Sequence, residues 1–137
     1  MAEYDLASNV KIMPAINPAS HADISEGISI DTKGYESVTF VVQSGALGAG
    51  TVDFVVQHAD DNGSGAAGAF TNVTVADDII GTIPTLTAAG EDNVARSFGY
   101  RGKKQWVRLQ SVETSAWTTA IFGASCILSN PTRIPVA

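Results

Sequence analysis

The residues of this sequence that could perform acid–base or nucleophilic chemistry are few and lie far apart. There are two histidines, His21 in a proline- and serine-rich segment and His58 at the end of a predicted strand. The single cysteine, Cys126, lies in the apolar run IFGASCIL, which is typical of a small buried hydrophobic residue. The sequence contains no G-x-S-x-G motif, phosphate-binding loop or dinucleotide fingerprint. We therefore expect no enzymatic activity and no cofactor.

The turn HADDNGSG is the one local group of oxygen ligands. Asp60, Asn62 and Ser64 alternate there, so that three oxygens could point at one cation, as Ca²⁺ prefers. Asp-Asn-Gly is also a strong turn sequence on its own, and the residues that follow, AAGAF, offer no bidentate carboxylate. We therefore predict a turn without a metal.

These residues sit on segments whose hydrophobic pattern has a period of two. The segments 36–43, 51–58 and 104–112 each alternate apolar with polar residues, as half-buried antiparallel strands do. Further candidate strands cover 27–30, 70–75, 79–83, 94–100 and 118–128, the last of them central or bent at Gly123. The alternation predicts eight inward side chains: Val38, Phe40, Val42, Val52, Phe54, Val56, Val107 and Leu109.

Glycine-rich spacers separate these strands, and Arg101-Gly102 between two strand-like runs predicts a hairpin turn. Helix is minor at best, because no long window keeps an apolar helical stripe free of Gly and Pro. The predicted class is all-β, an antiparallel β-sandwich or jelly roll in a single domain with extended termini. Residues 1–20 form an N-terminal arm or edge strand, 21–128 the sandwich and 129–137 a C-terminal arm, since both ends carry prolines.

Composition supports a folded domain that does not bind nucleic acid or membrane. The chain has 137 residues, 45% of them hydrophobic and 16% charged, which is enough for one core. Its net charge of −6 argues against nucleic acid, and no stretch is apolar for the length of a membrane span. The N-terminus lacks the basic start and apolar run of a signal peptide, so synthesis in a cytoplasm is expected.

The charge is unevenly distributed along the chain. Residues 34–95 contain eight acids and no Lys or Arg, and five of the eight basic residues then fall within 96–108. This asymmetry fits either a contact surface between subunits or ordinary solvated strand residues. Trp106 likewise fits an interface or a second core layer. The candidate interface residues are Tyr100, Arg101, Lys103, Lys104, Trp106, Arg108, Trp117 and Arg133.

Three pieces of the sequence, in this order, resemble a known family. They are VDFVVQHADDNGSGAAGAFTNV, FGYRGKKQWVRL and CILSNPTRIPVA. The sequence resembles small virion proteins of tailed bacteriophages, which are commonly encoded beside the major capsid protein and carry a similar Y-x-G-x-x-x-x-V-R-L core. The resemblance implies a decoration (cement) protein on the capsid surface. Its partners would be the major capsid protein and copies of itself, in a homo-oligomer.

Two other functions remain open. A phage neck or tail structural protein would have similar sequence features. The run Phe70-Thr71-Asn72-Val73, with Trp106 to Leu109, also resembles the strands of discoidin-like carbohydrate-binding modules. Those modules usually belong to longer secreted chains with a disulfide or a calcium site, whereas this sequence has one cysteine.

Overall fold

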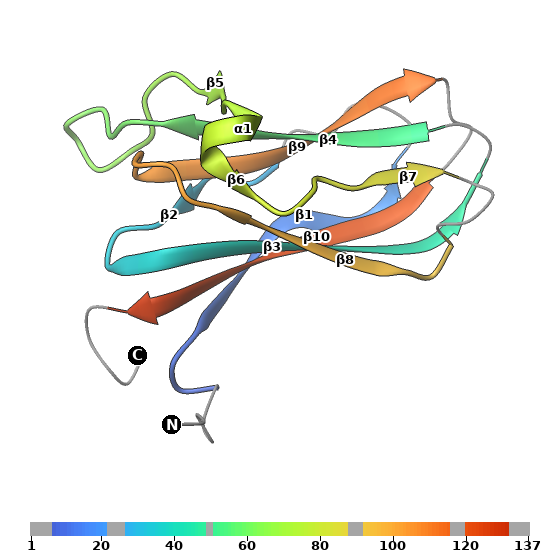
Figure 1. Ribbon diagram of the computed structural model, residues 1–137, viewed down its shortest axis with the longest axis horizontal. Coiled ribbons are helices and arrows are strands. Elements are labelled where there is room, and N and C mark those ends of the chain that lie inside the picture. Colours follow the sequence, from blue (N-terminus) through green and yellow to red (C-terminus); the bar gives the residue numbers. More distant parts are fainter. Residues whose placement is uncertain (1–6, 22–26, 49–50, 88–91, 116–119, 132–137) are drawn as a thin grey trace.

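The computed structural model describes residues 7–21, 27–48, 51–87, 92–115 and 120–131. It is a sandwich of two antiparallel sheets with a single turn of helix among these residues (Figure 1). The predicted all-β sandwich is therefore confirmed. No helix in the described ranges is long and apolar enough to cross a membrane.

The first layer, sheet A, is the lower layer in Figure 1 and has the strand order β1-β10-β3-β8-β6. Its two longest neighbouring strands, β3 and β10, pair over most of their length and form the centre of the sheet. The strands are β1 (Lys11–His21), β10 (Ala120–Pro131), β3 (Tyr35–Leu47), β8 (Ala95–Tyr100) and β6 (Ile79–Ile80).

The second layer, sheet B, has the order β2-β9-β4-β5, and β7 also pairs with β4. β5 and β7 pair with opposite ends of β4. The segment between them leaves sheet B, forms β6 at the edge of sheet A and then returns to sheet B as β7. The strands are β2 (Ile30–Asp31), β9 (Trp106–Ser115), β4 (Thr51–Ala59), β5 (Thr71–Asn72) and β7 (Thr85–Thr87).

The core lies between the sheets and contains all eight side chains that the alternation placed there. Each of the eight is less than 9% exposed, so the predicted register of the three main strands is confirmed. Phe54 of β4 meets Phe122 of β10 edge to face across the layers, with ring centroids 5.5 Å apart. Cys126 is also fully buried in this core, as predicted.

Two glycines allow the backbone to approach closely where a side chain would not fit. A Cβ on Gly27 would lie 1.9 Å from the carbonyl oxygen of Leu109. Next to it, Ile28 N–H donates to Ala15 O at 2.8 Å, which joins β1 to the segment before β2. A Cβ on Gly123 would lie 2.8 Å from the Cα of Pro18, so β1 can pack tightly over β10 only at a glycine.

The last strand candidate, 118–128, is confirmed as an interior strand, because β10 lies between β1 and β3. Its pairing shifts register between Ala120 and Phe122, just before Gly123. The strand continues to Pro131, past the predicted end of the sandwich at 128. The remaining C-terminal residues, 132–137, lie outside the described part of the chain.

The N-terminal segment contains β1, which lies at one edge of sheet A and pairs only with β10 in that sheet. Pro14 and Pro18 fall within β1, and the register shifts on either side of Ile16. Proline has no N–H for a second neighbouring strand, so an edge position suits this sequence.

The predicted hairpin at Arg101-Gly102 is wrong. Residues 101–105 leave β8 in sheet A and enter β9 in sheet B, so they cross between the layers. Gly and polar residues suit a hairpin and a crossing loop equally well, and the turn sequence therefore could not distinguish the two.

The predicted strand over 70–75 is only partly correct. Thr71 and Asn72 pair with β4, but Val75 begins the short helix α1 (Val75–Asp78) and is exposed. Thr74 O accepts the N–H groups of Asp77 and Asp78, while Thr74 N–H donates to the Asp78 carboxylate. These local hydrogen bonds compete with strand pairing and end it after Asn72.

We predict that Phe54→Ala lowers the free energy of unfolding by about 3–5 kcal/mol, because it leaves a cavity between the sheets. Its strand neighbour Val55 is only half-buried, and Val55→Ala is the matched control with a much smaller cost. Urea unfolding of the two variants measures both values. Equal costs at the two positions would show that the alternation does not define the core.

Candidate functional site

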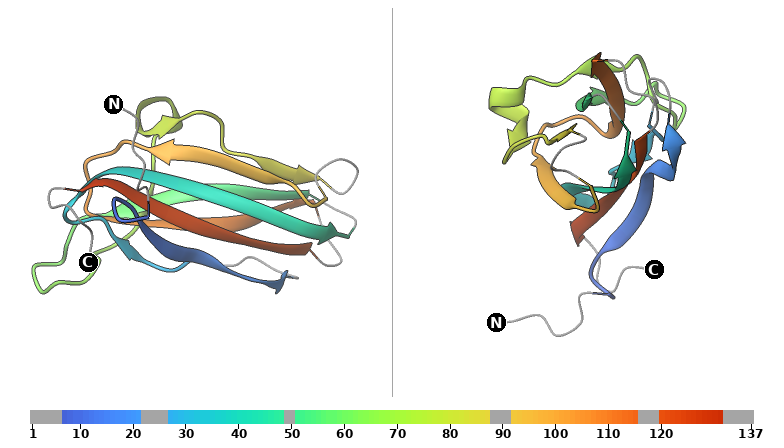
Figure 2. Two further views of the ribbon diagram at one scale, coloured as in Figure 1. Left: turned by 90° about the horizontal axis from the view of Figure 1, so that it is seen from below. Right: turned by 90° about the vertical axis from the view of Figure 1, so that its right-hand side faces the viewer.

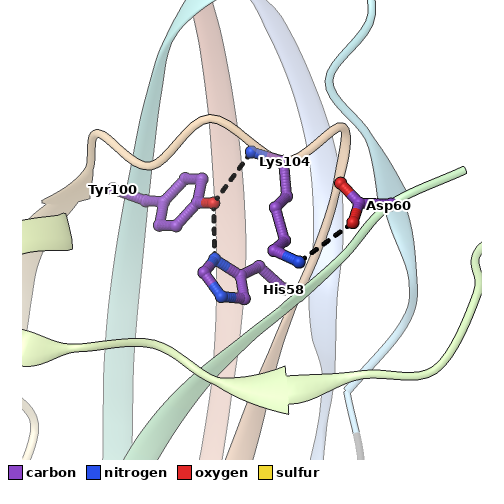
Figure 3. A network of polar contacts seen from close by, with 4 residues as sticks. All are labelled: His58, Asp60, Tyr100 and Lys104. Carbon is purple, nitrogen blue, oxygen red and sulfur yellow. Dashed lines mark hydrogen bonds and ion pairs between the residues drawn. The ribbon is translucent and has the colours of Figure 1, made fainter.

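Four side chains gather at one end of the sandwich, where β4, β8 and the crossing segment 101–105 meet (Figure 3). They are His58 and Asp60 from the end of β4, Tyr100 from the end of β8 and Lys104 from the crossing segment. Hydrogen bonds connect these four residues in one chain, from His58 to Tyr100, from Tyr100 to Lys104 and from Lys104 to Asp60.

A chain of polar contacts connects sheet B to sheet A. His58 Nδ1 lies 2.8 Å from the Tyr100 hydroxyl, and the two rings meet edge to face with centroids 5.8 Å apart. The Lys104 backbone N–H donates to the same hydroxyl at 3.4 Å, and its Nζ lies 3.0 Å from Asp60 Oδ2. The tyrosine oxygen thus accepts from Lys104, and its proton is available to donate to Nδ1 of a neutral imidazole.

Gly102 makes this arrangement possible. A Cβ at this position would lie 2.2 Å from the Tyr100 hydroxyl oxygen and 2.4 Å from the ring carbon that carries it. The crossing segment therefore folds over the phenol ring only because residue 102 has no side chain. The glycine that was predicted to turn a hairpin instead lets the segment pack on the ring.

The surroundings keep both ring groups neutral near pH 7. Burial lowers the pKa of His58; Lys104 also lowers it, while Asp78 and Asp60 oppose the shift. Burial raises the pKa of Tyr100. The hydrogen bond from the Lys104 N–H lowers this pKa, whereas the negative charges of Asp78 and Asp60 raise it further. A phenol with a raised pKa is a poor source of phenolate, so the cluster suits a structural link between sheets better than proton transfer.

The loop between β4 and β5 folds back over the outer face of sheet B. Trp106 is half-buried there, and its indole N–H donates to Asp61 Oδ1 at 3.2 Å. This hydrogen bond and the N–H of Gly63 lower the pKa of the Asp61 carboxyl. Trp106 is therefore neither a second core layer between the sheets nor an open anchor, because the chain's own loop engages it.

Arg108 is held on the same face. Its guanidinium carbon lies 4.2 Å from the centroid of the Phe70 ring, and its Nε donates to Gln57 Oε1 at 2.7 Å. Gln57 in turn donates to Asn72 Oδ1 at 2.9 Å, which ties β4, β5 and β9 together. Stacking on an aromatic ring orients the guanidinium within the domain rather than toward a partner.

The basic segment pairs with the acidic middle of the same chain. Lys104 contacts Asp60, and Arg101 Nε donates to Asp77 O at 2.8 Å while its backbone N–H donates to Asp78 O. Of these contacts, only that of Lys104 with Asp60 pairs opposite charges, since Arg101 donates to backbone carbonyls. Arg101 and Lys103 remain exposed at this end of the sandwich.

Six of the eight predicted interface residues are described: Tyr100, Arg101, Lys103 and Lys104 lie at the end of β8 and in the crossing segment, and Trp106 and Arg108 lie on β9. Trp117 and Arg133 lie outside the described residues. Sequence analysis missed the roles of His58, Asp60 and Asp61 as partners of these residues. His58 and Tyr100 are 42 positions apart, and no local pattern indicates that they meet.

The turn weighed as a calcium site uses its oxygens internally. Asn62 Oδ1 accepts the N–H of Ser64 at 2.7 Å, and Asp61 Oδ2 accepts the N–H of Gly63 at 2.9 Å. Asp60 contacts Lys104. Within the described ranges, no group of three or more His, Cys, Asp or Glu side chains is arranged to hold a metal ion.

The cysteine thiol is unsuited to nucleophilic chemistry. Cys126 is fully buried, and burial raises the pKa of its thiol to about 12. The thiolate, which is the nucleophile, is therefore scarce at neutral pH. Fold and cluster together define an all-β sandwich whose polar groups fasten one end of the domain.

Comparisons with known proteins add little to this description. No family model and no curated protein matches the sequence. Among solved structures, a chain in the structure of infectious bursal disease virus, Gx strain, is similar with a TM-score of 0.46 and 10% identity. The match covers 92% of this chain and 33% of that chain, so this chain spans about a third of the length of its structural neighbour.

We predict that His58 makes the domain less stable in acid. Its pKa is lowered in the folded state, so the unfolded chain binds the proton more readily once the pH falls below about 6.5. The folded state favours the neutral imidazole of His58, so this contribution to the free energy of unfolding is present at pH 8 and is lost as the pH falls to 5. Urea unfolding at both pH values should show a smaller loss for His58→Gln than for the original chain, and equal losses would contradict the prediction.

We also predict that calcium does not stabilise the protein. A ligand that binds only the folded state must raise the midpoint of thermal unfolding. Thermal melting with micromolar calcium, with magnesium as the control, should leave the midpoint unchanged. A rise of several degrees with calcium alone would establish a site at the turn of Asp60, Asn62 and Ser64.

Proposed function

We propose that this chain is a structural virion protein without catalytic activity, which binds the outside of a phage head and stabilises it. The observation that carries the proposal is the position of the three sequence pieces that resemble small phage virion proteins. The first covers most of β4, the loop after it and β5, the second is the crossing from β8 to β9, and the third contains the end of β10.

The three pieces meet at one end of the sandwich. Ala59 of β4 pairs with Trp106 at the start of β9, and Tyr100 at the end of β8 pairs with Val38, which also pairs with Leu128 of β10. The pieces come from separate parts of the sequence, and these pairings place them beside one another at that end. A shared docking surface explains why they would occur together.

This end also carries exposed positive charge on a protein of net charge −6. Lys103 and Arg101 are exposed there, while Lys104 is held by Asp60. Exposed cations at one end can orient the domain toward an acidic surface and make docking sensitive to salt. Rim charges of this kind mainly affect the association rate.

The proposal is tested by mixing the purified protein with phage heads that lack it and sedimenting the particles. The original protein should sediment with the heads, and Lys103→Glu should weaken binding most at low salt. Arg96→Glu is the matched control, since Arg96 pairs with Val42, four residues along β3 from the docking end.

Lys104→Glu is the less informative variant, because it also places a second acid beside Asp60. Protein that stays in the supernatant at every salt concentration would refute head binding. Specific binding on a glycan array would then favour the carbohydrate-binding alternative, and sedimentation with isolated tails would favour a neck or tail protein.

A further inference from the structure

The outward-pointing positions in the strands of sheet A carry no charged residue among the described residues. The only charged residues in its five strands are Lys11, Glu36 and Arg96, all near strand ends. Lys11 pairs with Leu128 and Arg96 with Val42, and both partners point into the core, so these charged residues occupy inward positions. Glu36 alternates with Ser37 and shares the inward parity of Val38. The outward positions of the sheet A strands therefore carry no Asp, Glu, Lys or Arg among the residues that the structure describes.

A row of apolar and small residues crosses this face from one edge to the other. Ile12 pairs with Ile127, Ile127 with Thr39, Thr39 with Gly99, and Gly99 with Ile80. The two outer isoleucines are 63% and 55% exposed. Between them, Ile127, Thr39 and Gly99 are half-buried. Apolar residues that lie side by side on a surface can mark an interaction site, whereas single exposed ones need no explanation.

Two hollows of similar size lie on the same face. One, of about 360 Å³, lies over Thr39 and Gly99 beside Ile80, and the other, of about 350 Å³, lies over Gly45 and Gly123 beside Ile121. Figure 2, left, looks onto this face, with β8, β3, β10 and β1 side by side. Each hollow is bordered by an exposed isoleucine, and Glu36 and Arg101 also line the first of them.

This relief suits a second copy of the same chain. A two-fold axis presents the same patch on both partners, so an isoleucine of one copy can enter a hollow of the other. Both copies carry a net charge of −6, with acids in the loop after β4 and in α1, so contact through those parts would oppose like charges. The uncharged face avoids that repulsion.

The area is of the right order for such a contact. Five strands spaced about 4.8 Å apart, with roughly eight residues each at about 3.3 Å, give a flat area of roughly 600 Å² before side-chain relief is counted. A stable interface buries about 800 Å² on each partner. The face therefore approaches the size needed without contributions from other parts of the domain.

We infer that two copies of this chain associate through the outer faces of their A sheets. The inference rests on the proposed function, in which several copies act together, and it names the surface that those copies share. Of the two hollows, the one beside Ile80 is also lined by Tyr100 and Arg101 of the docking end, whereas the one beside Ile121 lies away from that end.

Sedimentation velocity of the purified full chain tests the inference without any phage particle. The original protein should form a species of twice the 14.2 kDa chain mass. Ile121→Lys places like charges in the contact from both sides and should raise the dissociation constant at least about tenfold. Val75→Lys is the matched control, since Val75 is 58% exposed on α1 and away from the face, and it should leave the constant unchanged.

Cross-linking supplies a second measurement, which does not require that the fold accept a lysine in place of Ile121. Ser125 points outward between Pro14 and Val41, and Ser125→Cys introduces a thiol near the middle of the face. The native Cys126 is buried, and burial raises its pKa to about 12, so it does not compete with the introduced thiol for the cross-linker. A short bismaleimide should link Ser125→Cys into dimers and leave Val75→Cys monomeric.

Three results would overturn the inference. One is a chain that stays monomeric at about 100 μM, where even weak specific dimers form. Another is an Ile121→Lys variant that is folded and dimerises as well as the original. The third is a monomeric original chain whose Ile121→Lys variant loses binding to heads, which would assign the face to the particle. Dimerisation without any head binding would instead refute the proposed function and leave the face as an interface.

Discussion

The packing of two sheets against each other, with Phe54 of β4 meeting Phe122 of β10 edge to face, is the contact on which the rest of this structure depends. Each sheet is apolar on its inner side, and neither could remain in water alone with that side exposed. Phe40 and Phe98 stack within sheet A beside this contact, with centroids 5.6 Å apart. Burial of these rings fixes the register of β3, β4, β8 and β10, because a shift by one residue would turn each ring to the solvent.

At the ends of the sandwich the space between the two sheets must be shielded from water, and the polar cluster fills this space at one end. At this end the apolar packing continues as far as Val56 and Val107, and beyond them the space between the sheets holds His58 and Tyr100. A hydrogen bond between partly buried groups satisfies both and links the sheets at the place where the apolar packing ends. Charged residues then extend the link to the surface through Lys104 and Asp60.

The two outer faces of the sandwich differ in a way that bears on function. On sheet B, Trp106 and Arg108 look like interface anchors in the sequence, yet the loop after β4 and Phe70 engage them within the chain. On sheet A, the outward residues are mostly small or apolar, and no charged side chain occupies an outward position in the described strands. Residue types that commonly form interfaces are thus used inside the domain, whereas an inconspicuous set of Ile, Thr, Ser and Gly forms the more open surface.

The sequence by itself determined the fold class and the core. Alternation of period two depends only on the geometry of a strand, so Val38, Phe54 and Leu109 could be placed inward without knowing which strands pair. It could not determine that residues 101–105 cross between layers, or that His58 meets Tyr100 and Asp61 meets Trp106. Nor could it show that Gly27 faces a backbone oxygen of Leu109. These contacts join residues far apart in the chain, and only the order of the strands in the two sheets brings them together.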